Sequence, residues 1–287
     1  MKTANVFPGS SILVEGQVPF ESLLLLGPSG IGKTIFCKQF LYNGLITGRP
    51  CIYVTTNEAP EEICVSMKNY GFDVEPYNET GIFRIIDCYS WKLGRESSSE
   101  YTVSNPADLT TLSMTIDKAT RGLKKIHLVL DSITGLKSIC NHNETTFSKF
   151  LQMTVARIRL MNGYAIMTAA PEAHNQQFLS FLRLAFGGIL EMKGDDSGKE
   201  IKRLLRIFSL RGARHKTHWT TFEITNKGIA IKNAVKNERS NRCAMCSKLI
   251  KGDPHLETVK GKKFSFDSEE CAKTYRKLKS LYGEDFE

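Results

Sequence analysis

Short apolar runs alternate with segments of helical periodicity along most of the chain. The runs are rich in leucine and β-branched residues and lie at 23–26, 51–56, 82–88, 126–132, 164–168 and 189–192. Such runs are typical of strands buried on both faces of a sheet. The segments between them place apolar residues at helical spacing, at about 35–44, 60–71, 105–121 and 147–162. This alternation predicts an α/β fold with a mainly parallel sheet flanked by helices.

The two ends of this pattern differ from its middle. Residues 11–15 are predicted to form a short edge strand, and 203–210, 220–224 and 228–231 are predicted to form terminal antiparallel strands. No internal repeat is visible, so we interpret residues 1–232 as one domain. The polar and charged run 233–242 then reads as a linker, and residues 243–287 as a small separate module.

A glycine-rich loop joins the first apolar strand to the first helix. It reads Gly27-Pro28-Ser29-Gly30-Ile31-Gly32-Lys33-Thr34, in the order of strand, phosphate loop and helix that a nucleotide triphosphatase requires. Glycines let backbone amides converge on a polyanion, and the start of a helix adds a favourable dipole. We expect Lys33 to reach the β- and γ-phosphates of ATP, and the Thr34 hydroxyl to ligate Mg²⁺. The competing interpretation is a chance match in a glycine-rich turn.

The apolar strand at 126–131 ends in a carboxylate, Asp131, which Ser132 follows. An aspartate at the end of a strand beside a phosphate loop is the Walker B arrangement, in which the carboxylate holds Mg²⁺ directly or through water. Without that loop, a loop cap is the better interpretation of the same residue. We therefore assign Asp131 and Ser132 to the Mg·ATP site.

Three cysteines gather near the C-terminus. Cys243 and Cys246 have the spacing of a zinc knuckle, and Cys271 opens a predicted helix. The segment that ends in Cys271 resembles small treble-clef zinc modules of the TRASH, YHS-like and plant FLZ kinds, and Asp267 stands where these commonly have their third cysteine. Asp267 can complete a tetrahedral, structural Zn²⁺ site, with His255 as the alternative fourth ligand. The competing interpretation is a set of free cysteines on a disordered tail.

Composition limits the classes of function. The 287-residue chain is 41% hydrophobic and 24% charged, as in ordinary globular proteins, and 39 Lys and Arg against 30 Asp and Glu give a net charge of +9. A basic balance is compatible with nucleic acid as a partner, although no aromatic-interleaved basic motif accompanies it. No apolar run is long enough to span a bilayer and no signal peptide opens the chain, so we expect a cytoplasmic protein without membrane contact. The other five cysteines lie in apolar segments and are expected to be buried free thiols: Cys37, Cys51, Cys64, Cys88 and Cys140.

Five motifs in combination resemble one known family, the KaiC-like ATPases of the RecA/RadA superfamily. They are the phosphate loop and the segments 53–62 (Tyr-Val-Thr-Thr-Asn-Glu-Ala-Pro-Glu-Glu), 85–90, 129–132 and 210–215. The resemblance covers roughly residues 8–232 and implies a RecA-like phosphate-loop core. It also implies ATP binding, commonly in hexameric rings with the nucleotide between subunits, so a homo-oligomer is expected.

The chain departs from this family at two catalytic positions. The family usually has paired glutamates after its second strand, the first of which activates water, whereas this chain has Asn57-Glu58. Asparagine can orient a water but cannot take its proton. Glu58 is therefore either the substitute base or a surface carboxylate at the start of the next helix. The family's Lys-x-Arg pair, which reaches the γ-phosphate of the neighbouring subunit, falls on Ser209 and Arg211, so the lysine is missing.

Arg211 remains a candidate arginine finger in trans, with Arg214 and His215 beside it. The alternative is a solvated basic hairpin. Since both departures weaken hydrolysis, we expect a slow ATPase that acts as a switch or regulator. Two other functions stay open: an ATP-sensing scaffold with little hydrolysis, and a RecA-related accessory protein that binds single-stranded DNA through loops 137–146 and 171–180. The C-terminal module is a candidate contact for a protein partner.

Overall fold

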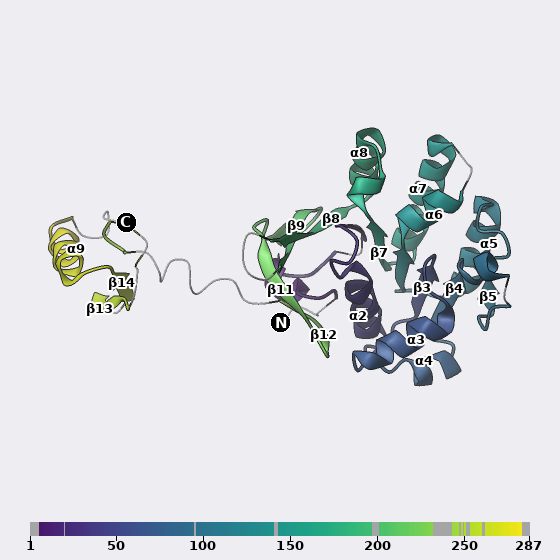
Figure 1. Ribbon diagram of the computed structural model, residues 1–287, viewed down its shortest axis with the longest axis horizontal. Coiled ribbons are helices and arrows are strands. Elements are labelled where there is room, and N and C mark those ends of the chain that lie inside the picture. Colours follow the sequence, from purple (N-terminus) through teal and green to yellow (C-terminus); the bar gives the residue numbers. More distant parts are fainter. Residues whose placement is uncertain are drawn as a thin grey trace. The chain divides into compact units, whose positions relative to one another are not determined.

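The computed structural model describes residues 6–19, 21–94, 96–140, 143–196, 201–231, 243–246, 248, 250, 253–259 and 262–282. The chain divides into two compact units, within residues 1–232 and 233–287, and each is described by itself (Figure 1). The linker predicted at 233–242 lies outside the described residues.

The first unit alternates strands and helices as the apolar pattern predicts. Its elements, in chain order, are α1 (Ser10–Leu13), β1 (Val14–Glu15), β2 (Ser22–Leu26), α2 (Lys33–Leu45), β3 (Cys51–Thr55), α3 (Pro60–Asn69), α4 (Glu75–Glu79), β4 (Phe83–Asp87), the 3-10 turn η1 (Ser90–Leu93), β5 (Tyr101–Thr102), α5 (Leu109–Thr120), β6 (His127–Asp131), α6 (Ile133–Ile139), α7 (Glu144–Leu160), β7 (Tyr164–Ala169), η2 (Pro171–Ala173), α8 (Gln176–Ala185), β8 (Gly188–Asp195), β9 (Lys202–Leu210), β10 (Arg214–His215), β11 (Thr220–Thr225) and β12 (Gly228–Ile231).

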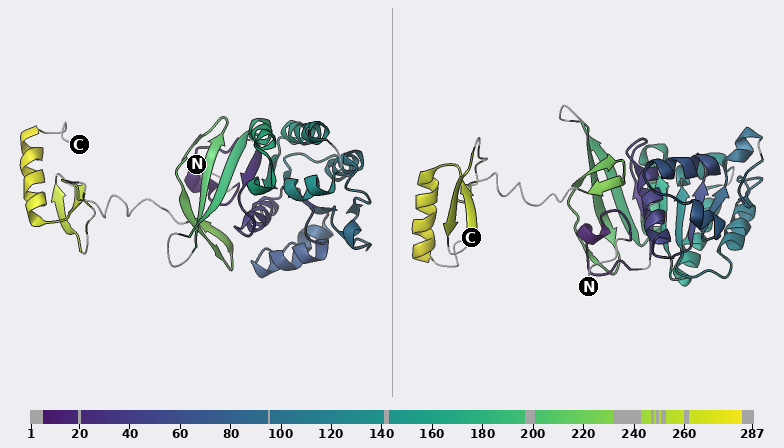
Figure 2. Two further views of the ribbon diagram at one scale, coloured as in Figure 1. Left: turned by 45° about the horizontal axis from the view of Figure 1, so that its top comes forward. Right: turned by 90° about the horizontal axis from the view of Figure 1, so that it is seen from below.

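A ten-stranded sheet runs through the unit in the order β12-β11-β9-β8-β2-β7-β6-β3-β4-β5. Every neighbouring pair from β8 to β5 is parallel. The pairs β8–β9, β9–β11 and β11–β12 are antiparallel. The predicted α/β class and mainly parallel sheet are confirmed, and so are the terminal antiparallel strands. Figure 2 shows helices on both sides of the sheet.

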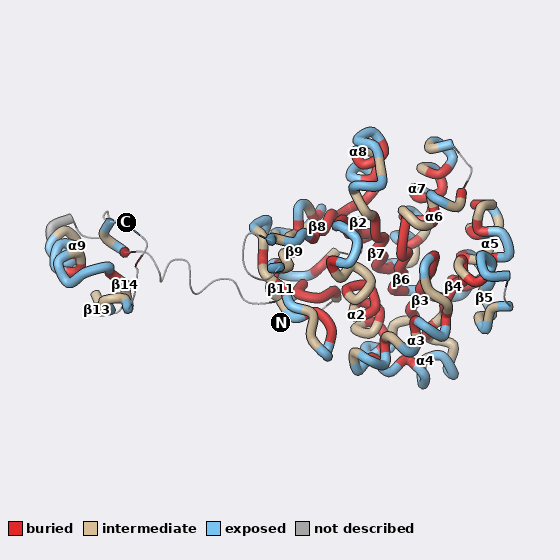
Figure 3. The backbone as a smooth tube through the Cα atoms, in the orientation of Figure 1, coloured by how far each residue is buried: buried red, intermediate tan, exposed pale blue. Residues whose placement is uncertain are grey.

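The sheet separates two apolar cores, and β2 contributes to both because successive side chains of a strand face opposite ways. Leu23 and Leu25 pack in the core covered by α2 and α3. Leu24 and Leu26 pack in the core covered by α5, α6, α7 and α8. The central strands are buried along their length (Figure 3). This double burial explains why β2 is an unbroken apolar run.

The edge strand predicted at 11–15 is largely wrong. Gly9 takes a left-handed conformation with φ of 82°, and its carbonyl accepts hydrogen bonds from Ile12 and Leu13. A short helix, α1, therefore occupies most of this segment. Only Val14 and Glu15 are extended, and they pair with β10 in a separate two-stranded sheet.

Three further helices, α4, α6 and α8, were not predicted, although α6 and α8 each begin at a side-chain cap. The Ser132 hydroxyl accepts a hydrogen bond from the Gly135 amide, and Asn175 Oδ1 accepts one from the Phe178 amide. Serine and asparagine are preferred residues at this position. Helix α5 likewise begins later than predicted, because Asp108 caps it.

The described residues of the second unit form a hairpin and a helix: β13 (His255–Val259), β14 (Lys262–Phe266) and α9 (Glu269–Tyr282). Its small core consists of Cys243, Ile250, Phe266, Ala272 and Tyr275. Among the residues that the structure describes, this core and the partly buried side chains packed on it are few, so a bound metal ion would contribute to folding.

All eight cysteines are free, and Cys64 is only half-buried, in contrast to the burial expected for it. Within the described residues, no helix is long and apolar enough to cross a membrane.

Candidate functional site

The phosphate loop lies between β2 and α2, where a parallel strand meets a helix. Gly32 has φ of 118°, a conformation that favours glycine. At Gly27, a side chain has no room, since an added Cβ is only 2.9 Å from the carbonyl oxygen of Met192 on β8. The first amides of an α-helix have no carbonyl partner within the helix. The loop thus ends on a set of backbone donors and a positive dipole, which suit an anion.

Lys33 is the first residue of α2 and folds back over the loop. Its Nζ donates hydrogen bonds to the carbonyl oxygens of Gly27 at 2.6 Å and Pro28 at 2.8 Å. Burial lowers the pKa of the Lys33 ammonium, while the negative charges of Asp131 and Glu172 oppose this shift. The ammonium therefore lies at the loop and within the field of two carboxylates.

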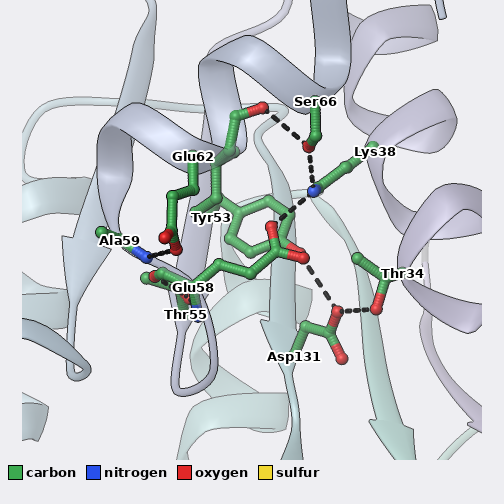
Figure 4. Close-up of polar contacts among 10 residues, drawn as sticks. Thr34, Lys38, Tyr53, Thr55, Glu58, Ala59, Glu62, Ser66 and Asp131 are labelled. Atoms are coloured by element: carbon green, nitrogen blue, oxygen red, sulfur yellow. Dashed lines mark hydrogen bonds and ion pairs between the residues drawn. The ribbon is translucent and has the colours of Figure 1, made fainter. Parts of the chain in front are cut away.

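Three hydroxyl groups converge on the Asp131 carboxylate at the end of β6, and Figure 4 shows two of them, those of Thr34 and Tyr53. Thr34 Oγ1 donates to Oδ2 at 2.7 Å, and the Tyr53 hydroxyl donates to the same oxygen at 3.1 Å. Thr168 Oγ1 of β7 donates to Oδ1 at 2.6 Å. Asp131 is only 7% exposed, so these donors supply the hydrogen bonds that a buried carboxylate needs. Burial, followed by the charge of Asp131, raises the pKa of Tyr53, which keeps its hydroxyl a donor.

The backbone after Asp131 is also fixed. The Asp131 carbonyl accepts hydrogen bonds from the Thr56 amide and hydroxyl, and the Ser132 amide donates to Thr56 Oγ1 at 3.0 Å. Ser132, which was assigned to the nucleotide site, uses its hydroxyl to cap α6. The segment after β3 and the end of β6 are thereby joined directly beside the phosphate loop.

Glu58 lies in the loop between β3 and α3, next to Asn57. Its Oε2 forms an ion pair with the Nζ of Lys38 at 2.5 Å, and Lys38 also donates to the Ser66 hydroxyl (Figure 4). Asn57 is exposed, and its Oδ1 is 2.9 Å from the position that a Cβ on Gly135 would take. Glu58 is therefore not simply a surface carboxylate, because it has a buried cationic partner.

A third carboxylate, on Glu172 of η2, reaches the outer part of the phosphate loop. Its Oε1 accepts a hydrogen bond from the Ser29 amide at 3.2 Å. Both residues are exposed. Glu172 was not among the residues selected from the sequence, where it stands in a polar segment with no recognisable motif.

Arg211 lies towards the opposite end of the strands from the phosphate loop of the same chain. It follows Leu210 of β9, which is level with Gly188 of β8 and, through it, with Leu23 of β2. The phosphate loop leaves the other end of β2, beyond Leu26, roughly 10 Å further along the strand direction. Arg211 is thus poorly placed to contact a nucleotide bound at the phosphate loop of its own chain.

The neighbours of Arg211 lie on β10, which pairs with β1 in the separate two-stranded sheet. His215 is on β10, opposite Val14 of β1, and Arg214 is opposite Glu15. Arg211 donates to the Leu184 carbonyl at 3.3 Å. Of the predicted nucleotide-site residues, the structure brings the phosphate loop, Asp131, Ser132, Asn57 and Glu58 together in one chain, and it does not bring Arg211 or His215 to them.

The segments considered for DNA binding are largely structured and engaged within the fold. Lys137 is in α6, where its Nζ forms a 2.7 Å ion pair with Glu144 and lies 4.5 Å from the centre of the buried Phe178 ring. Residues 176–180 belong to α8 rather than to a loop. His174 Nε2 is 2.9 Å from Thr134 Oγ1, and burial lowers the pKa of its imidazole.

In the second unit, four predicted metal ligands come together. The ligand atoms of Cys243, Cys246, Asp267 and Cys271 all lie within 4.8 Å of one another. His255 is not in this cluster, and its Nε2 lies instead 3.3 Å from Glu257 Oε1.

The sequence alone did not identify four of the residues around Asp131 and Glu58: Tyr53, Thr168, Lys38 and Ser66. Tyr53, Thr168 and Lys38 share one signal, a polar group inside an apolar strand or helix face. A lysine in the run Ile-Phe-Cys-Lys-Gln-Phe-Leu is the clearest case, since a buried ammonium requires a partner. The partner itself could not be read from the sequence.

The first unit thus combines a RecA-like sheet with a phosphate loop and a strand-terminal aspartate, which defines a nucleotide-binding phosphate-loop protein. The profile of the KaiC ATPase family matches residues 10–236. The chain belongs to this family of ATPases, as its motifs suggested.

Known relatives agree with this assignment. A UPF0273 protein of Pyrococcus horikoshii is 30% identical over 78% of this chain and 91% of its own length. A UPF0273 protein of Thermotoga maritima is 29% identical over 78% of this chain and 93% of its own. The crystal structure of a KaiC-like protein from Pyrococcus horikoshii superposes with a TM-score of 0.63 at 24% identity, covering 81% of this chain and 99% of that one. The predicted RecA-like fold is confirmed.

Proposed function

We propose that this chain binds Mg·ATP at the phosphate loop and hydrolyses it slowly, as a nucleotide-dependent switch. The observation that carries the proposal is the 2.7 Å hydrogen bond between Thr34 and Asp131 at the end of that loop. A hydroxyl and a carboxylate are oxygen ligands of the kind that Mg²⁺ prefers. Lys33 and the first amides of α2 are the groups that bind the β- and γ-phosphates, and bound Mg²⁺ neutralises charge on them.

Slow turnover follows from the groups around the γ-phosphate position. Asn57 cannot accept a proton, which leaves Glu58, one position further along the chain, as the candidate base. Ser209 supplies no cation where the family usually has a lysine. We therefore assign ATP binding to the chain as its main activity and hydrolysis as a slow step that resets it.

The position of Arg211 supports a homo-oligomer. Its own phosphate loop is at the other end of the strands, so a role of Arg211 at a nucleotide requires the nucleotide of a neighbouring copy, as for an arginine finger. We propose a ring of identical subunits, with a hexamer as the size that the family resemblance favours. The nucleotide then lies between two subunits.

Two assays on the full chain test this function. A fluorescent ATP analogue measures binding, and a phosphate-release assay measures turnover. We expect tight Mg²⁺-dependent binding, turnover far below that of ring motors, and larger particles in mass photometry when ATP is present. Fast turnover contradicts the switch, and the absence of any phosphate release favours a scaffold that only senses ATP.

We also propose a structural Zn²⁺ ion in the second unit, bound by Cys243, Cys246, Asp267 and Cys271. In a tetrahedral site, Zn–S bonds of about 2.3 Å place ligand atoms roughly 3.8 Å apart. The mutual distances of at most 4.8 Å fit such a site after small side-chain adjustments. Three thiolates and a carboxylate are a suitable donor set for Zn²⁺, and the ion stabilises a unit whose apolar core is small. The zinc-bound unit is then a candidate surface for a protein partner.

Metal analysis of protein purified without chelators tests the zinc site. We expect one zinc per chain, lost in Cys243→Ser and in Cys271→Ser. The matched control is Cys64→Ser, because Cys64 lies in the first unit, outside the cluster. The assignment is contradicted if Cys243→Ser and Cys271→Ser retain as much zinc as Cys64→Ser.

A further inference from the structure

Lys38 is a charged residue in an otherwise apolar part of α2. Its side chain is only 3% exposed, and the neighbouring Cys37 and Phe40 are fully buried. Lysine is almost never buried this deeply unless its ammonium is paired. Here the ammonium is paired with Glu58 at 2.5 Å and also contacts the Ser66 hydroxyl (Figure 4).

The position of Lys38 on α2 connects it to the phosphate loop. Lys38 and Thr34 are four residues apart, so their side chains lie on the same helix face. Thr34 contacts Asp131, and Lys38 contacts Glu58. A single helix face, which begins at the phosphate loop, therefore holds both carboxylates. Because the helix is stiff, the position of its first turn and the position of Glu58 are coupled.

Glu58 is held at both its backbone and its carboxylate. The Thr55 hydroxyl donates to the Glu58 carbonyl at 2.7 Å and accepts from the Glu58 amide at 3.2 Å. Lys38 binds Oε2, whereas Oε1 has no hydrogen-bond partner among the residues that the structure describes. The side chain is 32% exposed, so Glu58 is partly open to solvent. One oxygen is thus anchored while the other is available.

We propose that Lys38 is a positioning residue for ATP hydrolysis: it holds Glu58 so that Oε1 can accept a proton from the attacking water. The inference rests on the proposed ATPase function and deepens it. Asn57 occupies the place of the usual acidic residue, and the Lys38–Glu58 pair provides a carboxylate one position further along the chain. Lys38 itself touches neither the nucleotide nor the water.

The test uses the full chain with Lys38→Met, which removes the charge and keeps an unbranched side chain in apolar surroundings. Lys38→Arg is the matched control, because it keeps a cation for Glu58. We expect Lys38→Met to lower kcat by about tenfold or more, since a misplaced catalytic group costs this much. The KM and the Kd for Mg·ATP should change by less than about threefold, because the phosphate loop is untouched. Lys38→Arg should recover part of the lost kcat.

A second comparison separates positioning from a general structural effect. Glu58→Gln should be slow, and the double variant Lys38→Met/Glu58→Gln should be no slower, because the lysine acts only through the glutamate. If Lys38→Met does not fold, Lys38→Leu takes its place, since leucine also removes the donor to Glu58 and is a good helix former.

The outcomes distinguish this inference from the proposed function. Unchanged kcat in Lys38→Met, or fully additive losses in the double variant, overturns the role of Lys38. Wild-type protein that binds Mg·ATP but releases no phosphate also overturns it, and leaves nucleotide binding intact. Wild-type protein that does not bind ATP contradicts the proposed function itself.

Discussion

Replacing Thr168 with valine removes one of the three hydroxyl groups that fix Asp131. Valine has nearly the same shape and suits a strand, so the change mainly deletes the 2.6 Å hydrogen bond to Asp131 Oδ1. A hydrogen bond to a charged group contributes about 1.5–3 kcal/mol to stability. Thr168 is fully buried, which makes replacement of its hydroxyl by water difficult. We expect Thr168→Val to destabilise the first unit by about 2 kcal/mol.

Thr220 offers a matched control, because it is also a buried strand threonine. Its hydroxyl has no hydrogen-bond partner in the part of the chain that the structure describes. Burial of an unpaired hydroxyl is itself unfavourable by about 1–3 kcal/mol. Thr220→Val should therefore leave stability unchanged or raise it.

Urea unfolding followed by tryptophan fluorescence measures both variants. The chain has two tryptophans, Trp91 and Trp219, and both lie in the first unit, so the signal reports that unit alone. With a slope of about 2–3 kcal/mol per molar urea, Thr168→Val should lower the midpoint by about 0.5–1 M. Equal midpoints for Thr168→Val and Thr220→Val would refute the reasoning that the hydroxyl anchors Asp131.

Three further predictions concern other parts of the first unit. Burial lowers the pKa of His127 to about 3, against 6.5 for the exposed group. Below pH 6.5 the imidazole of the unfolded chain takes up a proton and that of the folded chain does not, so the free energy of unfolding falls as the pH is lowered. The loss of stability at pH 5 is about 2 kcal/mol. In His127→Leu the urea midpoint should therefore fall less between pH 7 and pH 5 than in the wild type, and an equal fall contradicts the argument. Gly187→Ala should lower the free energy of unfolding by about 1–3 kcal/mol through overpacking, because its Cβ falls 1.9 Å from Cδ of the ion-paired Glu21; a wild-type urea midpoint contradicts it. Arg211→Ala and Lys33→Ala should each abolish phosphate release, and a mixture of the two proteins should recover part of it if Arg211 acts in trans; a mixture no better than either alone contradicts that role.

The parts of the fold that sequence predicted well depend on local patterns. The phosphate loop is a contiguous motif, and the run that ends at Asp131 is a strand buried on both faces, so each carries its own signal. The strand predicted at 11–15 failed because one glycine, Gly9, turns the chain into a helix before Val14. Helix α8 was missed because Asn175 and the glutamines after it resemble a polar loop, although Asn175 is a good helix cap.

The parts that sequence could not predict depend on pairing between distant segments. Tyr53, Thr168 and Asp131 meet because β3, β6 and β7 are neighbours in the sheet, and no local pattern shows strand order. The partner of Lys38, Glu58, is 20 residues away, beyond any helical spacing rule. The distance of Arg211 from its own phosphate loop follows from the register of β9 on β8 and β2, which is visible only in the folded chain.

Titration calorimetry of ATP into the full chain, with and without Mg²⁺, tests the central claim most directly. The account predicts saturable ATP binding that is stronger with Mg²⁺, a loss of binding in Lys33→Ala, and a loss of the Mg²⁺ effect in Asp131→Asn. The urea midpoints of both variants establish that they are folded. Folded wild-type protein that gives no binding heat at several temperatures, or Lys33→Ala protein that binds as tightly as wild type, contradicts the assignment of this loop as the nucleotide site.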